Sequence, residues 1–123
     1  MREAARVLIV DDDEDVRDVI TATLNGHGWD LVAVPSAHAA LDALADAPVA
    51  LVITDLSMPE MSGVELVRAM VAQGVTTPVL VISGRTDLIA QLPALEPVRG
   101  VVGKPFNVRD LRARVRAVLE GGG

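Results

Sequence analysis

The chain contains no cysteine, and this absence excludes two kinds of stabilisation. Disulfide cross-links and thiolate metal sites both need the cysteine thiol, so its 123 residues must fold without either. Cysteine-free sequences are compatible with a reducing compartment, and we expect a cytoplasmic protein.

Large aromatic residues are also scarce. Tyrosine is absent, and Trp29 and Phe106 are the only large rings. Half of the residues are nevertheless apolar, which is typical of a folded domain and not of a disordered chain. The core must therefore be built from valine, leucine, isoleucine, alanine and methionine.

The chain also lacks long apolar runs and an excess of positive charge. The apolar runs are only a few residues long, far below the ~20 residues of a membrane span, and the first ten residues do not resemble a secretion signal. A net charge of −6 argues against direct binding to nucleic acid, because phosphate neutralisation needs a basic surface. We therefore expect neither a membrane nor a nucleic acid as a direct partner.

Five short apolar segments recur along the chain. They are "RVLIV" (6–10), "LVAV" (31–34), "ALVIT" (50–54), "PVLVI" (78–82) and "GVV" (100–102). Most are continuous and not alternating, which indicates strands covered on both faces, as in a parallel sheet. Segments with helical spacing separate them, so the sequence predicts a doubly wound α/β domain with right-handed crossovers.

Four helices are indicated by their apolar faces and their boundary residues. The expected inward residues are Val16, Val19, Ile20 and Leu24 in the first, Ala37, Ala40, Leu41 and Leu44 in the second, Val64, Val67, Met70 and Val71 in the third, and Val108, Leu111, Val115 and Val118 in the last. Ser36 is placed to cap the second helix, and Gly26 and Gly74 to end the first and third.

The fourth crossover is weaker, because Pro93 and Pro97 interrupt it. We expect one or two helical turns near residues 86–92 and irregular chain after them. The length fits a single domain over residues 6–120, with residues 1–5 as a leader and 121–123 as a glycine tail or the start of a linker.

Polar side chains follow several of the predicted strands. Asp11 and Asp12 come after the first, Asp55 after the third, Ser83 after the fourth, and Lys104 after the fifth. In a sheet of this kind, ligands bind outside the carboxyl ends of the strands, so these side chains should share one edge. Gathered carboxylates repel one another and need a cation or a proton.

These residue types suit phosphoryl chemistry. Carboxylate oxygens, with waters and a phosphate, are ligands that Mg²⁺ accepts. A carboxylate can also act as a nucleophile and carry a phosphoryl group, while a lysine and a hydroxyl stabilise the phosphoryl oxygens. Lys104 is the only lysine, since all the other basic residues are arginine, and a compact ammonium suits a phosphoryl oxygen.

Four blocks, in their order and spacing, carry a resemblance to a known family. "VLIVDDDEDVRD", "LVITDLSMPEMSGVEL", "PVLVISG" and "VVGKPF" resemble the signature blocks of the receiver domain of bacterial two-component response regulators. The resemblance covers nearly the whole chain. It implies a five-stranded parallel sheet of the flavodoxin-like strand order 2-1-3-4-5 flanked by helices.

The resemblance also implies a role for each site residue. Asp55 would accept the phosphoryl group from a phosphohistidine on a histidine kinase or a phosphotransfer protein, and the phosphorylated domain would act on a downstream output protein or domain. Ser83 and Lys104 would contact the phosphoryl group. The Mg²⁺ ligands would be Asp11 (through a water), Asp12, Asp55 and the backbone carbonyl of Ser57.

Two positions depart from the family pattern. Val101 stands where many receivers have a tyrosine or phenylalanine that moves on phosphorylation, and Gly84 stands where alanine usually follows the hydroxyl residue. Because Pro93 and Pro97 also alter the fourth helix, we expect any output to run through the loop after Ser83 and that short helix.

Other interpretations remain open at this point. A small Mg²⁺-dependent phosphatase with an aspartate nucleophile would need a second acid where Ser57 stands. A phosphorylation-independent interaction module would fit Val101, and the receiver of a hybrid kinase or a multidomain regulator would fit the motifs equally well.

Asp13, Glu14 and Asp15 are expected to be ordinary residues of a helix N-terminus, and the arginines at 109, 112, 114 and 116 a solvated face or a partner surface. His27 and His38 lack ligand spacing and are expected at the surface.

Overall fold

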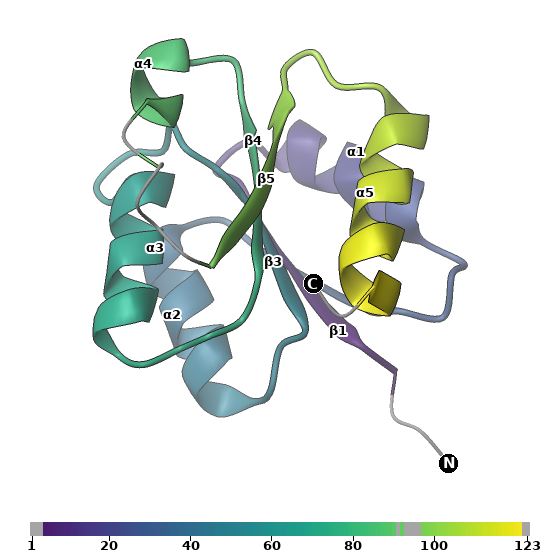
Figure 1. Ribbon diagram of the computed structural model, residues 1–123, viewed down its shortest axis with the longest axis horizontal. Coiled ribbons are helices and arrows are strands. Elements are labelled where there is room, and N and C mark those ends of the chain that lie inside the picture. Colours follow the sequence, from purple (N-terminus) through teal and green to yellow (C-terminus); the bar gives the residue numbers. More distant parts are fainter. Residues whose placement is uncertain (1–3, 91, 93–96, 122–123) are drawn as a thin grey trace.

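A computed structural model describes residues 4–90, 92 and 97–121, in which strands and helices alternate along the chain (Figure 1). The strands are β1 (Arg6–Val10), β2 (Asp30–Val34), β3 (Leu51–Asp55), β4 (Val79–Ser83) and β5 (Val98–Gly103). The helices are α1 (Glu14–Leu24), α2 (Ala37–Asp46), α3 (Gly63–Ala72), α4 (Thr86–Ile89) and α5 (Val108–Gly121). The predicted alternation is confirmed.

All five strands form one parallel sheet in the order β2-β1-β3-β4-β5. The order implied by the family resemblance is therefore confirmed. Ile9 of β1 lies beside Ile53 of β3, and Asp55 lies beside Ile82 of β4. This register brings the carboxyl ends of β1, β3 and β4 to the same edge.

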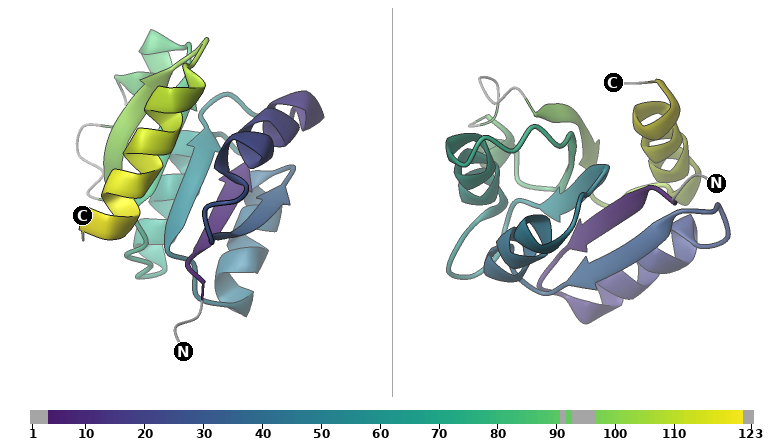
Figure 2. Two further views of the ribbon diagram at one scale, coloured as in Figure 1. Left: turned by 90° about the vertical axis from the view of Figure 1, so that its right-hand side faces the viewer. Right: turned by 90° about the horizontal axis from the view of Figure 1, so that it is seen from below.

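Helices cover both faces of the sheet, with α1 and α5 on one side and α2 and α3 on the other (Figure 1 and Figure 2). Successive strand residues point to opposite faces, so Leu8 packs in the cluster with α2 and α3 while Ile9 packs in the cluster with α1 and α5. The buried members of both clusters are aliphatic, with Met70 added in the first, as the composition predicts, and Trp29 and Phe106 pack at the border of the second. This burial on both faces explains why most strands are continuously apolar.

Side-chain caps begin the helices where the sequence places polar residues. Asp13 accepts from the Asp15 amide at the start of α1, and Ser36 accepts from the Ala39 amide at the start of α2. Ser62 and Glu65 form a reciprocal capping box at the start of α3. The ordinary N-terminal role expected for Asp13 is therefore confirmed.

Three residues assigned to inward helix faces, Val19, Val71 and Val108, were placed wrongly. Val19 of α1 and Val108 of α5 are 47% and 43% exposed. Val19 lies next to the buried Ile20, and one residue along a helix turns the side chain by about 100°, so α1 buries a narrower stripe than the apolar pattern suggests. Val108 is the first residue of α5, beyond the part of the helix that Leu111 and Val115 pack into the core. Val71 of α3 is also exposed.

In its described residues, the weak fourth crossover contains the short helix α4, within the range expected. Pro93 and residues 94–96 lie outside the described residues, as do residues 1–3 of the expected leader and 122–123 of the expected tail. Within the described ranges, no helix combines the length and the apolar content needed to cross a membrane.

Candidate functional site

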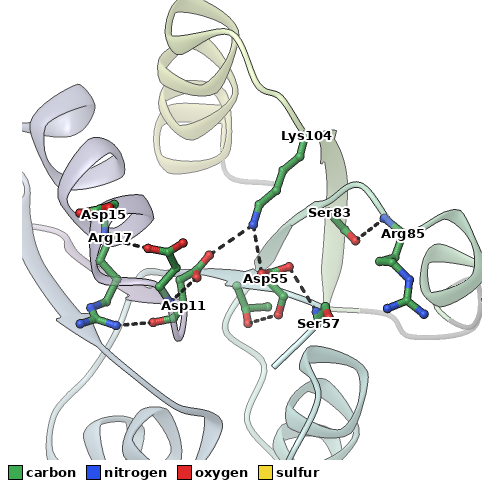
Figure 3. Close-up of polar contacts among 10 residues, drawn as sticks. Asp11, Asp15, Arg17, Asp55, Ser57, Ser83, Arg85 and Lys104 are labelled. Carbon is green, nitrogen blue, oxygen red and sulfur yellow. Dashed lines mark hydrogen bonds and ion pairs between the residues drawn. The ribbon is translucent and has the colours of Figure 1, made fainter. Parts of the chain in front are cut away.

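The polar residues at the strand ends meet at one edge of the sheet, as predicted (Figure 3). Asp55 is the last residue of β3 and is 8% exposed, while Asp11 directly follows β1 and is 1% exposed. Asp12 is exposed. One carboxylate oxygen from each of the three lies within 4.8 Å of the others, although Asp11 and Asp12 follow β1 and Asp55 ends β3.

Asp11 is held by its neighbours but keeps one oxygen without a hydrogen bond. Its Oδ1 accepts from the Asp13 amide at 2.9 Å. Its Oδ2 is buried and has no hydrogen-bond partner, and Lys104 Nζ lies 3.6 Å away, too far for a hydrogen bond. Burial raises the pKa of Asp11, against the lowering effects of the Asp13 amide and the Lys104 charge.

Lys104 reaches into the carboxylates from the loop after β5. Its Nζ donates to Asp55 Oδ2 at 3.0 Å, while its backbone amide donates to the carbonyl of Ser83 at 3.2 Å. Partial burial disfavours the ammonium, but the hydrogen bond to Asp55 and the charges of Asp11 and Asp55 outweigh this and raise the pKa of Lys104. Lys104 is therefore a fixed positive charge at the mouth of the site.

The two serines contribute through different atoms. Ser57 donates its backbone amide to Asp55 Oδ1 at 3.2 Å, so this amide and Lys104 bind one oxygen of Asp55 each. Ser83 is buried, and its Oγ accepts from the Arg85 amide at 3.0 Å. Because that bond uses a lone pair of the hydroxyl, the Ser83 hydrogen remains available to a further acceptor.

The residues present fit a hard divalent cation. Three carboxylates converge here with one ammonium, and a buried oxygen of Asp11 lacks a hydrogen bond. Such oxygens suit a cation that takes carboxylates, carbonyls and water as ligands. The acidic cluster is therefore consistent with a metal site.

Gly63 lets α3 begin directly against the end of β3. A Cβ at this position would collide with the carbonyl oxygen of Asp55 and would lie 2.8 Å from the Cα of Leu56. The Gly63 amide donates to the carbonyl of Leu56 at 2.9 Å. The glycine thus allows close packing just behind the Asp55 carboxylate.

Arg109, Arg114 and Arg116 of α5 are exposed, as expected for a solvated face, while Arg112, Arg114 and Arg116 also contact other elements. Arg112 and Arg114 donate to the carbonyls of Thr23 and Val101 at 3.4 and 3.2 Å. Arg116 lies 3.3 Å from Nδ1 of His27, whose ring stacks on Trp29 at a centroid distance of 5.2 Å. His27 is thus half-buried between elements, whereas His38 is exposed.

One contact at the site was not anticipated from the sequence. Arg17 of α1 donates from Nη1 to the backbone carbonyl of Asp11 at 2.7 Å. An arginine in the first turns of a helix is normally predicted to be a surface residue. The contact of Arg17 with the acidic loop depends on where α1 packs on the sheet, which the sequence does not show.

Comparisons with known proteins agree with this geometry. The family described as response regulator receiver domain matches residues 7–116. The DNA-binding response regulator MtrA of Mycolicibacterium smegmatis is 34% identical over 115 residues, covering 93% of this chain and 50% of that protein. The chain spans about half the length of the curated relatives it matches.

Solved receivers have the same fold. The chemotaxis response regulator CheY4 of Vibrio cholerae is 30% identical with a TM-score of 0.85, covering 94% of this chain and 99% of that one. A response regulator receiver protein of Pseudomonas putida is 28% identical with a TM-score of 0.87, covering 94% and 98%. The chain therefore belongs to the response regulator receiver domain family of two-component signalling, and it is a phospho-accepting receiver and not a metabolic enzyme.

Proposed function

We propose that Asp55 is the residue that receives the phosphoryl group. The observation that carries this proposal is the arrangement of its carboxylate, which ends a buried strand within 4.8 Å of two other carboxylate oxygens and 3.0 Å from the Lys104 ammonium. Asp12 is exposed and Asp11 is 1% exposed, whereas Asp55 is held at both oxygens by the Ser57 amide and Lys104, so Asp55 is the carboxylate best placed as a rigid nucleophile.

The transfer follows from these contacts. A carboxylate oxygen of Asp55 attacks the phosphorus of a phosphohistidine, the O–P bond forms, and the P–N bond breaks with its electron pair going to the imidazole nitrogen. Lys104 then pairs with a phosphoryl oxygen, and the hydroxyl hydrogen of Ser83 serves another. Hydrolysis by water later restores the Asp55 carboxylate.

The metal in this proposal is Mg²⁺. Asp11, through a water, Asp12, Asp55 and the backbone carbonyl of Ser57 would hold it. When bound, Mg²⁺ neutralises the gathered carboxylates and the oxygens of the transferring phosphoryl group. The backbone amide of Ser57 already orients Asp55, which supports this loop as part of the site.

The partners belong to the same proposal. A histidine kinase or a phosphotransfer protein supplies the phosphoryl group, and a downstream protein or domain reads the phosphorylated state. Ser83 connects the site to the Arg85 amide at the start of α4, which supports output through the loop after Ser83. Val101, in the position of the usual ring, is half-buried and its carbonyl accepts from Arg114.

Intact-mass spectrometry tests the proposal directly. The chain is incubated with phosphoramidate and Mg²⁺, beside Asp55→Asn and a sample containing EDTA. We expect one added phosphoryl group on the wild type with metal, and none on the variant or without metal. Wild type that binds Mg²⁺ but stays unmodified would instead favour a phosphorylation-independent interaction module.

A further inference from the structure

Arg17 is attached to the acidic loop through the backbone and not through a carboxylate. Its Nη1 donates to the carbonyl oxygen of Asp11 at 2.7 Å, and the side chain is partly buried. Figure 3 shows Arg17 and Lys104 on opposite sides of Asp11, so the two cations act on different parts of the same residue.

This bond fixes the direction of the peptide that joins the two acids. A peptide unit is planar, so holding the carbonyl of Asp11 also sets the orientation of the amide of Asp12. On the other side, the Asp11 amide donates to the carbonyl of Val34 in β2 at 3.3 Å. Asp11 is therefore held at its amide by β2, at its carboxylate by Asp13 and at its carbonyl by Arg17.

We infer that Arg17 is a positioning residue for the divalent cation, acting through the backbone between Asp11 and Asp12. This inference rests on the proposed metal site. Arg17 holds the peptide so that the exposed Asp12 carboxylate stays beside those of Asp11 and Asp55. Without it, the loop samples orientations in which Asp12 turns away to solvent.

The charge of Arg17 and its positioning role should change the affinity for Mg²⁺ in opposite directions. A guanidinium near three carboxylates repels a cation, so its removal should strengthen Mg²⁺ binding if charge is all that matters. If Arg17 acts by positioning, its removal should weaken binding instead. Loss of groups that orient metal ligands typically costs about tenfold or more in affinity.

Isothermal titration with Mg²⁺ on the metal-free full chain separates the two effects. For Arg17→Met, which removes both charge and donor, we expect the association constant to fall about tenfold. Arg17→Lys keeps a charged donor and should recover part of the loss. With phosphoramidate, the Arg17→Met phosphorylation rate should be low at limiting Mg²⁺ and approach wild type at saturating Mg²⁺.

Arg68→Met, an exposed arginine of α3, is the matched control for loss of one positive charge. Circular dichroism checks that each variant folds, and Arg17→Gln replaces Arg17→Met if the latter does not. Unchanged or tighter Mg²⁺ binding by a folded Arg17→Met would overturn the positioning role while leaving the proposed site intact. Wild type that binds no Mg²⁺ would instead remove the metal site itself, and the inference with it.

Discussion

Asp11 is the most enclosed of the three site carboxylates, and its enclosure has an energetic cost when no cation is bound. One of its oxygens lacks a hydrogen bond, and burial raises its pKa. Leaving a buried charged group incompletely satisfied costs roughly 1–3 kcal/mol. The unsatisfied charge of Asp11 therefore lowers the free energy of unfolding of the metal-free protein.

Replacing this charge should stabilise the metal-free protein. In EDTA at pH 7, Asp11→Asn should raise the free energy of unfolding by roughly 1 kcal/mol, because an amide oxygen still accepts from Asp13 while the buried charge is gone. Urea unfolding measures the change. Asp12→Asn, at an exposed position, is the control and should gain less. A destabilised Asp11→Asn would contradict this account.

The same effect has a defined pH dependence. The pKa of Asp11 is higher in the folded state than its ordinary value, so the folded state binds this proton more tightly than the unfolded chain does. The destabilisation from Asp11 is thus complete above the folded pKa and is relieved as the pH falls through it. The difference in the free energy of unfolding between Asp11→Asn and wild type, measured by urea unfolding in EDTA, should accordingly become smaller as the pH is lowered.

At the scale of elements, the contact between α3 and the end of β3 depends on a missing side chain. Gly63→Ala places a methyl group against the backbone of Asp55 and Leu56, where nothing flexible can yield. We expect a loss of about 1–3 kcal/mol in the free energy of unfolding, measured in urea. Because the backbone that must shift is that of Asp55, phosphorylation by phosphoramidate should also slow.

Gly84→Ala is the matched control for that substitution. A Cβ at Gly84 would lie 3.6 Å from the Cβ and the carbonyl oxygen of Lys104, an ordinary contact distance. The backbone at Gly84 does not adopt a conformation that requires glycine. The alanine should therefore leave the free energy of unfolding unchanged or raise it by about 0.4–1 kcal/mol. Equal losses from both substitutions would show that space at Gly63 is not the cause.

The elements also show how far the sequence could predict the structure. Continuous apolar runs located the strands to within one or two residues, because burial on both faces leaves a strong pattern. The strand order came from the family resemblance, since periodicity does not define which strands are neighbours. Val19, Val71 and Val108 were misplaced because an apolar residue at the edge of a helical stripe has the same sequence pattern whether it is covered or exposed.

The site divides in the same way. Asp11, Asp12, Asp55 and Lys104 were predictable because strand ends of a parallel sheet share one edge. The contacts of Arg17 and of the α5 arginines were not, because each joins a helix side chain to a backbone carbonyl outside its own helix or near the end of another element. Such bonds depend on how the helices pack on the sheet, and short-range sequence patterns do not predict that packing.

At the scale of the whole molecule, the sheet lies between two clusters of buried apolar residues, and the site lies at the carboxyl ends of its strands. A cation bound there should stabilise the entire fold, because it binds the folded state and not the dispersed carboxylates of the unfolded chain. At a free Mg²⁺ concentration one hundred times its dissociation constant, the gain is about 2.7 kcal/mol.

Thermal unfolding across a Mg²⁺ series checks this expectation. The melting temperature should rise more with Mg²⁺ than with NaCl at the same ionic strength, because NaCl only screens the net charge of −6 whereas Mg²⁺ also binds the site. The variant carrying both Asp12→Asn and Asp55→Asn should lose the difference between the two salts. An equal response to both salts in the wild type would show general screening instead of a site.

The single lysine has a practical consequence. Reagents that acylate amines have one side-chain target in this chain, and that target is hydrogen-bonded to Asp55. Immobilisation or dye attachment that reaches this amine would remove a charge from the site, although the raised pKa of Lys104 and its hydrogen bond to Asp55 slow the reaction. Because cysteine is absent, a thiol introduced on a distant surface would be the only one in the molecule, and maleimide chemistry there would leave Lys104 untouched.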